Sequence, residues 1–275
     1  MVSRTIIEAG RSHRAYWSEL WQYRELFYML TWRDVKVRYK QTTLGILWAI
    51  IRPLLTMLVF TFIFGRIAGM QAQTAVPYAI IVFAGVLPWQ FFAGTLTETS
   101  GSLIGNERLI TKIYFPRIII PASTVITGFL DFLISLGLLV ILFLIWGYMP
   151  PVSFFALPLF TVLAVVAAAG PGLLLTALNV QYRDFRYIVP FLVQVGLFIS
   201  PVGFESHVIP ETWKYVFALN PMAGVIDGFR WCIVQGAANP LLAAPFYISL
   251  ASSLLWLFIA FSRFRRMEKN FADLL

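Results

Sequence analysis

The sequence predicts an all-α membrane protein with six transmembrane helices, an N-terminal amphipathic interface helix and two short re-entrant helices before the last span. Hydrophobic residues make up 59% of the 275 residues and charged residues only 12%, whereas about a quarter of the residues in a soluble domain are charged. Long apolar stretches divide the chain, and they lack the alternating pattern of an outer-membrane barrel. The stretches must be helices, since isolated strands would leave backbone groups unpaired in hydrocarbon.

The distribution of positive charge predicts how these helices are oriented. The six spans are expected at about 44–65, 76–97, 118–146, 154–178, 187–203 and 245–262. Of the 21 Lys and Arg, 17 fall in the N-terminal segment, the second and fourth connecting loops and the C-terminal tail. Cytoplasmic loops retain Lys and Arg, so we expect both termini in the cytoplasm. The formal net charge of +8 then reflects topology and anionic headgroups, and we expect no nucleic-acid partner.

Residues 1–43 form the first predicted region, a cytoplasmic segment with an amphipathic helix over 16–40. Aromatic rings there have basic neighbours, a combination that suits a helix lying in the headgroup plane. The residues expected to contact lipid headgroups are Arg33, Lys36 and Arg38. A purely anchoring role and a substrate-facing role are both compatible with this pattern.

Residues 44–275 form the second predicted region, a single transmembrane domain. Pro88 lies in the second span and is expected to kink or break it. Between the fifth and sixth spans, the semi-apolar run 222–234 is interrupted by charges and is too short to cross a bilayer. We therefore expect two short helices, near 210–219 and 221–235, that dip back into the membrane from the external face across the region 203–245.

Catalytic and metal-binding constellations are missing from the sequence. The two histidines, His13 and His207, are predicted on opposite sides of the membrane, without other ligands at metal-binding spacing. No G-x-x-x-x-G-K-[ST] motif occurs, so the chain cannot cradle ATP phosphates in a P-loop. If the protein transports actively, ATP hydrolysis must come from another subunit.

Polar groups are few inside the predicted spans. Arg52 lies about two turns inside the first span and must either snorkel to headgroups or face a polar cavity, where it could bind a lipid phosphate. Asp131 in the third span is expected to form a packing contact with Ser or Thr on another helix; a role in ion coupling has little support. Aromatic rings could line a conduit, although lipid contact is the better explanation for any single ring. The candidate channel or substrate residues are Arg52, Phe60, Tyr78, Trp89, Phe198 and Tyr39.

Two predicted cytoplasmic loops could serve either as connectors or as handles for an ATPase. The first, GSLIGNERLITKIYFPR at 101–117, can form a short surface helix. Its expected apolar anchors are Leu109, Ile110, Ile113 and Tyr114, and its expected polar contacts are Asn106, Glu107, Arg108 and Lys112. The second loop, NVQYRDFRY at 179–187, carries Arg183 and Asp184.

Five motifs in this order resemble the ABC-2 type permeases that export polysaccharides, most closely the O-antigen (Wzm-like) membrane subunits, with teichoic-acid and capsule permeases as relatives. The motifs are LGILWAIIRP at 44–53, LPWQFF at 87–92, NERLITKIYFPR at 106–117, YRDF at 182–185 and NP at 220–221. The resemblance covers roughly residues 23–275, and the first 22 residues look like a variable extension.

The resemblance implies a homodimer of non-enzymatic permease subunits in the bacterial inner (cytoplasmic) membrane. Each subunit would pair with a separate ABC ATP-binding subunit that binds ATP and Mg²⁺, so no cofactor is expected in this chain. First and fifth spans of both copies would frame a channel for a lipid-linked polysaccharide. Residues 103–115 would match a coupling helix that docks on the ATPase, with the YRDF loop nearby. The residues assigned to coupling are Asn106, Glu107, Arg108, Leu109, Lys112, Arg183 and Asp184, and those assigned to an external gate are Pro201, Asn220 and Pro221.

Other functions remain open at the level of the sequence. Within the family, the cargo could be teichoic acid or a capsular polysaccharide. A membrane-embedded transferase acting on polyprenyl-linked sugars would need paired acids, for which Glu107 and Asp184 are the available cytoplasmic-loop residues. An ion-coupled carrier would require Asp131 or Glu98 to bind the driving cation.

Overall fold

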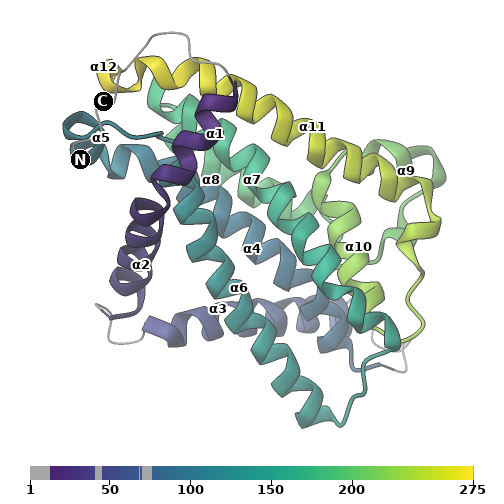
Figure 1. The fold of residues 1–275 in the computed structure, drawn as a ribbon. Helices are drawn as coiled ribbons and strands as arrows, with labels where there is room; N and C mark the ends of the chain where they lie inside the picture. Colours follow the sequence, from purple (N-terminus) through teal and green to yellow (C-terminus); the bar gives the residue numbers. More distant parts are fainter. Residues whose placement is uncertain (1–12, 41–44, 68, 70–75, 275) are drawn as a thin grey trace.

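The computed structural model describes residues 13–40, 45–67, 69 and 76–274, and this part of the chain is a helical bundle without strands (Figure 1). Its main helices are α1 (His13–Gln22), α2 (Arg24–Lys40), α3 (Gly45–Phe60), α4 (Tyr78–Gly105), α5 (Glu107–Lys112), α6 (Ile119–Trp146), α7 (Leu157–Gln181), α8 (Phe185–Ile199), α9 (Glu211–Phe217), α10 (Pro221–Ile233), α11 (Ala244–Met267) and α12 (Phe271–Leu274). Shorter turns are η1 (Thr61–Ile67), η3 (Val152–Ala156), η4 (Ser206–Val208), η5 (Pro240–Leu242) and η6 (Glu268–Asn270). The end of the bundle that carries α5 and α12 is called the α5 end below.

Five helices in the described part of the chain are long and apolar enough to cross a membrane. They are Leu47–Ile67, Tyr78–Gly105, Ile119–Trp146, Val152–Gln181 and Ala244–Asn270. The fifth predicted span corresponds to α8, which has 15 residues. At 1.5 Å per residue it rises about 22 Å, less than the roughly 30 Å of a hydrocarbon core. The structure thus confirms an all-helical protein with five candidate spans, and the sixth stays a prediction.

Helix α4 lies at the centre of the bundle, between α3, α6, α7, α8 and α10. Most of its residues are buried, on all sides of the helix, as expected of a helix surrounded by other helices. Pro88 lies within it and the helix continues on both sides, so of the two predicted outcomes, a kink or a break, the break does not occur. Packing on all sides holds the chain on its helical path despite the missing N–H of the proline.

The predicted helix over 16–40 consists of two helices that meet at Tyr23. The helical hydrogen bonds continue through the junction, from Tyr23 N to Glu19 O at 3.1 Å and from Phe27 N to Tyr23 O at 3.0 Å. The chain therefore bends there without unwinding. The bend brings Trp17 of α1 onto Phe261 of α11, where the two rings stack at 5.6 Å between centroids. The direction of α1 therefore depends on its contact with α11, which the spacing of residues within α1 could not predict.

Two hydrophobic cores hold the helices together. The larger one surrounds α4 and extends to α7 and α10. The smaller one, at the α5 end, joins α2, α5, α7, α11 and α12 through residues that include Leu30, Ile110, Val180 and Phe264. The two short helices before α11 form as expected, with bounds close to those predicted, although their re-entry into a membrane stays a prediction.

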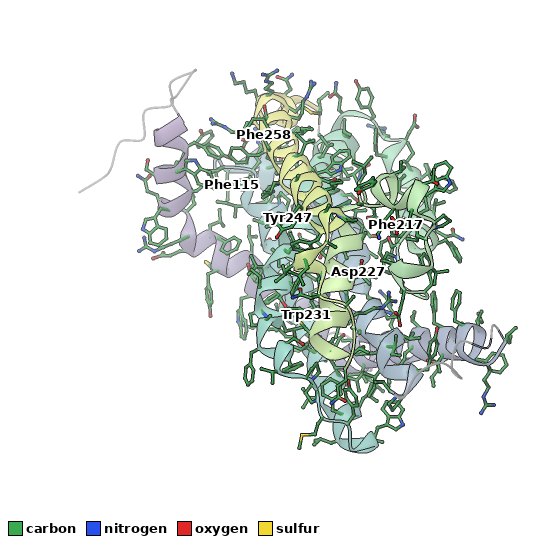
Figure 2. All side chains as sticks on the ribbon, turned by 90° about the vertical axis from the view of Figure 1, so that its right-hand side faces the viewer. Phe115, Phe217, Asp227, Trp231, Tyr247 and Phe258 are labelled. Carbon is green, nitrogen blue, oxygen red and sulfur yellow. The ribbon has the colours of Figure 1, made fainter. Side chains whose placement is uncertain are left out.

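Helix α10 approaches α7 very closely at Gly228. A Cβ atom at this position would lie 1.9 Å from Cδ1 of Phe160, a buried ring. Glycine is therefore required here for packing, and the close approach holds α10 against the bundle. Figure 2 shows α10, with Asp227 and Trp231 labelled.

Candidate functional site

The loop over 101–117 contains α5. The residue just before this helix, Asn106, forms a polar contact with α2. Nη2 of Arg33 donates a hydrogen bond to Oδ1 of Asn106 at 2.8 Å. The amide of Asn106 in turn donates to the carbonyl oxygen of Ser102 at 2.9 Å. Arg33, predicted as a headgroup contact, is exposed but also joins α2 to the start of this loop, a contact that sequence spacing could not reveal.

One face of α5 is buried and the other is open. Ile110 is buried and Leu109 packs beside it, as expected of apolar anchors. Ile113 and Tyr114 are about half exposed, however, so their predicted role as anchors is wrong, and the buried ring is Phe115. The exposed residues of the segment form a mixed polar and apolar surface, here called the α5 surface: Glu107, Arg108, Thr111, Lys112, Ile113 and Tyr114.

The far end of the same loop is tied to the C-terminal segment. The backbone N–H of Arg117 donates to Oε1 of Glu268 at 2.7 Å, and the Arg117 guanidinium donates to the carbonyl oxygen of Glu268. The Tyr16 hydroxyl donates to Oε2 of the same carboxylate at 3.4 Å. Burial raises the pKa of Tyr16 above its usual range, with the Glu268 carboxylate adding to the effect. Glu268 therefore links the loop to α1, a role that sequence reasoning missed.

The YRDF loop joins α7 to α8 at the α5 end. Arg183 and Asp184 are exposed, while Val180, one turn earlier, belongs to the same small core as Ile110 of α5. Both segments assigned to coupling thus rest on one core and present charged residues outward.

A charged cluster joins α2 to the two long helices α4 and α6. Arg38 forms ion pairs with Glu98 and Asp131, and the Tyr39 hydroxyl donates to the other Asp131 oxygen. Burial opposes the charge on Arg38, but the hydrogen bond and the charge of Glu98, followed by the charge of Asp131, raise the pKa of the guanidinium. Burial, followed by the hydrogen bond to Asp131, raises the pKa of Tyr39.

These contacts change two interpretations of the sequence. Asp131 was expected to bond Ser or Thr on another helix, but its side-chain partners are a guanidinium and a phenol. Arg38 was expected at lipid headgroups, and the structure gives it two carboxylate partners within the chain. Helical spacing predicts which residues share a face, but it does not show which helix lies opposite.

The candidate channel residues occupy different environments. Tyr78 and Trp89 are buried in the large core, and the Tyr78 hydroxyl donates to the carbonyl oxygen of Gly203 at 3.2 Å. Those are core positions, away from the protein surface. Phe198 is 70% exposed, and Phe60 is partly buried against Phe64, with 5.5 Å between ring centroids.

Arg52 lies on the exposed side of α3, near a polar contact that the sequence did not single out. The Gln90 amide on α4 donates to the Thr56 hydroxyl at 2.9 Å and, at 3.4 Å, to the carbonyl oxygen of Arg52. In the described part of the chain the structure gives the Arg52 guanidinium no ion pair. This arrangement gives α3 a polar spot on an otherwise apolar exposed face.

The residues assigned to an external gate come together between α8 and α10. Oδ1 of Asn220 accepts the N–H of Met222 at 2.9 Å and caps α10, while its amide donates to the Ser200 hydroxyl at 2.9 Å. Pro201 is buried beside this contact, and the Ser249 hydroxyl of α11 donates to the carbonyl oxygen of Pro221 at 2.9 Å. The end of α8 is thereby fixed to the start of α10.

Arg230 of α10 is buried and binds the same segment further along. Its guanidinium donates to the carbonyl oxygens of Phe204 at 2.5 Å and Val202 at 2.9 Å. Asp227, one turn earlier, accepts the Ser206 hydroxyl at 2.7 Å. Burial raises the pKa of Asp227, although Arg230 and Ser206 counteract the effect. Charges that appeared only to interrupt an apolar run therefore shape the connection after α8.

Within the described residues there is no group of three His, Cys, Asp or Glu that could hold a metal ion. The side chains of His13 and His207 lie outside the described part of the chain.

A known family covers most of this architecture. The model of the family described as ABC-2 type transporter matches residues 25–234, from the start of α2 to just beyond α10.

Three relatives extend the similarity to nearly the full chain. The O-antigen export system permease protein RfbA of Klebsiella pneumoniae is 29% identical over 252 residues, which cover 91% of this chain and 95% of that protein. RfbA of Myxococcus xanthus is 29% identical over 260 residues, or 93% and 97% of the two chains. The polysialic acid transport protein KpsM of Escherichia coli is 26% identical over 243 residues, or 86% and 91%.

Proposed function

The chain belongs to the ABC-2 type transporter family, and we propose that it is the membrane-spanning permease subunit of an ATP-driven exporter of lipid-linked polysaccharide, of the O-antigen type. The observation that carries the proposal is the end-to-end similarity to permeases named for O-antigen and polysialic acid export. In this proposal the chain is not an enzyme, and ATP and Mg²⁺ are bound by a separate ABC subunit. Both chain termini and the α5 end face the cytoplasm of a bacterium, and the membrane is the inner one.

The α5 surface is the proposed docking site for the ATP-binding subunit. It combines charges of both signs with the half-exposed side chains of Ile113 and Tyr114, the mixture that a polar rim around an apolar contact provides. Arg33 braces the start of the loop and Glu268 its end. A push on α5 is therefore transmitted to α1, α2 and α11 together.

The channel is proposed to form between two copies of the chain. Helix α3 and helix α8 leave large apolar side chains uncovered, including Trp48, Leu58, Tyr187 and Phe198. Exposed apolar faces of this size are typical of surfaces that meet another chain or lipid. In the proposed dimer these helices frame the conduit, with Arg52 and Gln90 as its polar lining.

The alternative functions receive less support from the geometry. Asp131 and Glu98 both lie against the Arg38 guanidinium, so a driving cation would have to compete with an arginine for either carboxylate. Glu107 and Asp184, the candidate acids of a transferase, are exposed to solvent, which suits docking better than acid–base chemistry in a water-excluded site. A capsular polysaccharide remains the alternative cargo, because CtrC of Neisseria meningitidis, a capsule polysaccharide export inner-membrane protein, is 23% identical over 83% of this chain.

Reconstitution tests the proposal directly. The chain is placed in liposomes with the ABC subunit encoded beside it, and a lipid-linked polysaccharide is offered on the outer surface of inverted vesicles. We expect uptake that requires both proteins and ATP, and that stops when a catalytic carboxylate of the ABC subunit is replaced. Movement of the glycan by this chain alone, without any nucleotide hydrolase, would refute the proposal.

Docking is tested separately by co-purification. Glu107→Arg and Tyr114→Asp change the exposed α5 surface without touching its buried side, and each is expected to weaken retention of the ABC subunit about tenfold or more. Lys214→Glu, an exposed cation on α9, is the matched control and should leave retention unchanged. Wild-type retention by both α5 variants would show that docking occurs elsewhere.

A further inference from the structure

Helices α6 and α11 both pack against α7, and an apolar groove of about 460 Å³ lies between them. Its walls come from Pro121, Ala122 and Val125 of α6 and from Leu254, Leu257 and Phe258 of α11. Helices α4 and α7 form its floor. Figure 2 shows Phe258 on α11 toward the end of the bundle at which Phe115 also lies.

We propose that this groove binds a hydrocarbon chain of an anionic glycerophospholipid, whose phosphate lies against the basic end of α11. The groove lies on helices long and apolar enough to span a bilayer, so its occupant must be apolar. The aromatic ring at one end of the groove and the positive charge beyond it favour one phospholipid in a defined orientation over non-specific contact with bulk lipid.

The groove is closed at one end by an aromatic ring. Trp17 of α1 lines it and stacks on Phe261 with an interplanar angle of 10°. Trp residues prefer the membrane–water interface, so this ring marks the level at which the lipid headgroup begins. The hydrocarbon chain of the lipid then runs along the groove from Trp17, away from the α5 end.

Positive charge continues the same face of α11. Arg265 follows Phe261 by four residues, so it lies one turn further on the groove side. Its guanidinium lies 4.3 Å from the centroid of Tyr16, the residue next to Trp17. Arg263 lies on the opposite face of the helix. Arg266 and Lys269 follow within the next turn, and Glu268, which Arg117 and Tyr16 also bind, is the carboxylate near Arg265. The end of α11 thus carries more positive than negative charge, and Arg265 is the cation on the groove side.

Native mass spectrometry of the purified chain tests the proposal, with phosphatidylglycerol and phosphatidylcholine of identical acyl chains as probes. We expect about a fivefold preference for phosphatidylglycerol, with one molecule retained per chain. Ala122→Phe fills the groove and should abolish that retention, whereas Val162→Phe, at a 62% exposed position of α7 outside the groove, should not.

A second variant keeps the test informative if the filled groove impairs folding. Arg265→Gln leaves the groove open and should reduce the preference to nearly equal retention of the two lipids. Equal retention of both lipids by the wild-type chain, or an unchanged preference in Arg265→Gln, would overturn the proposal. The measurement requires neither transport nor an ABC subunit, so its failure would leave the proposed function untouched.

Discussion

Nη2 of Arg230 donates a 2.9 Å hydrogen bond to the main-chain carbonyl oxygen of Val202, and this contact fixes the segment after α8 to α10. The carbonyl is also packed against α4, because a Cβ atom at Gly85 would lie 2.8 Å from it. The guanidinium thus joins a set of polar contacts in this region, which includes the hydrogen bonds of Asp227 with Ser206 and of Tyr78 with Gly203.

Replacement of Arg230 by Met should destabilise the protein by about 3 kcal/mol, because two buried carbonyl oxygens lose their donors. The midpoint of thermal aggregation in detergent, followed by gel filtration, measures the effect. Lys214→Met removes an exposed cation on the same side of the bundle and should shift the midpoint little. Equal midpoints for the two variants would contradict the structural role given to Arg230.

Arg33→Ala should slow ATP-driven transport up to about fivefold while the ABC subunit still binds, because the hydrogen bond to Asn106 connects α2 to α5 but lies outside the α5 surface. Asn106→Ala should act similarly, and the double variant should be no slower than either single one. Transport rates in proteoliposomes give the comparison. Arg24→Ala, an exposed arginine on the same helix, serves as the control, and additive effects of the two main substitutions would argue against a shared contact.

Arg38→Met should lower stability by about 2 kcal/mol, because it leaves the carboxylates of Glu98 and Asp131 without their common cation. Glu98→Gln combined with Asp131→Asn in the Arg38→Met background should recover much of the loss. Thermal midpoints of the wild-type chain and these two variants provide the measurement, and Lys36→Met, an exposed cation on α2, provides the control. If the neutralised triple variant is no more stable than Arg38→Met, charge pairing is not the source of the effect.

Gly228→Ala should cost about 1–3 kcal/mol, because the added methyl group overlaps the buried ring of Phe160. Gly137→Ala is the matched control, since a Cβ atom there meets nothing within 4 Å in the helix α6 environment. The yield of monodisperse protein and its thermal midpoint report the difference. A normal midpoint for Gly228→Ala would mean that α10 and α7 can separate without penalty.

The positions of the spans could be predicted because they depend on apolar length alone. The start of α10 could also be predicted from the sequence. Asn220 is a typical capping residue, and Pro221 after it suits the first turn of a helix. Both signals are local. The structure reproduces five of the six predicted spans, although two of them continue eight residues beyond their predicted ends at 97 and 262.

Contacts between distant segments could not be predicted in the same way. Nothing along the chain shows that Arg38 faces Asp131, or that Glu268 reaches Arg117, because these pairs depend on how helices are arranged. The continuous path of α4 through Pro88 depends likewise on neighbours that surround it. The spacing of Ile113 and Tyr114 suggested burial, yet the chain leaves its helix after Lys112 and turns them outward.

The uninterrupted length of α4 has a mechanical consequence. With 28 residues it extends about 42 Å, and it runs from Tyr78, bonded to Gly203, to the residue that precedes Asn106 and α5. A continuous helix of this length moves along its axis as one rigid unit, so a displacement at one end reaches the other end. The helices that enclose it hold it against sideways displacement. In the proposed transporter, the direction in which an ATP-binding subunit pushes on α5, more than the size of that push, therefore decides whether the far side of the protein responds.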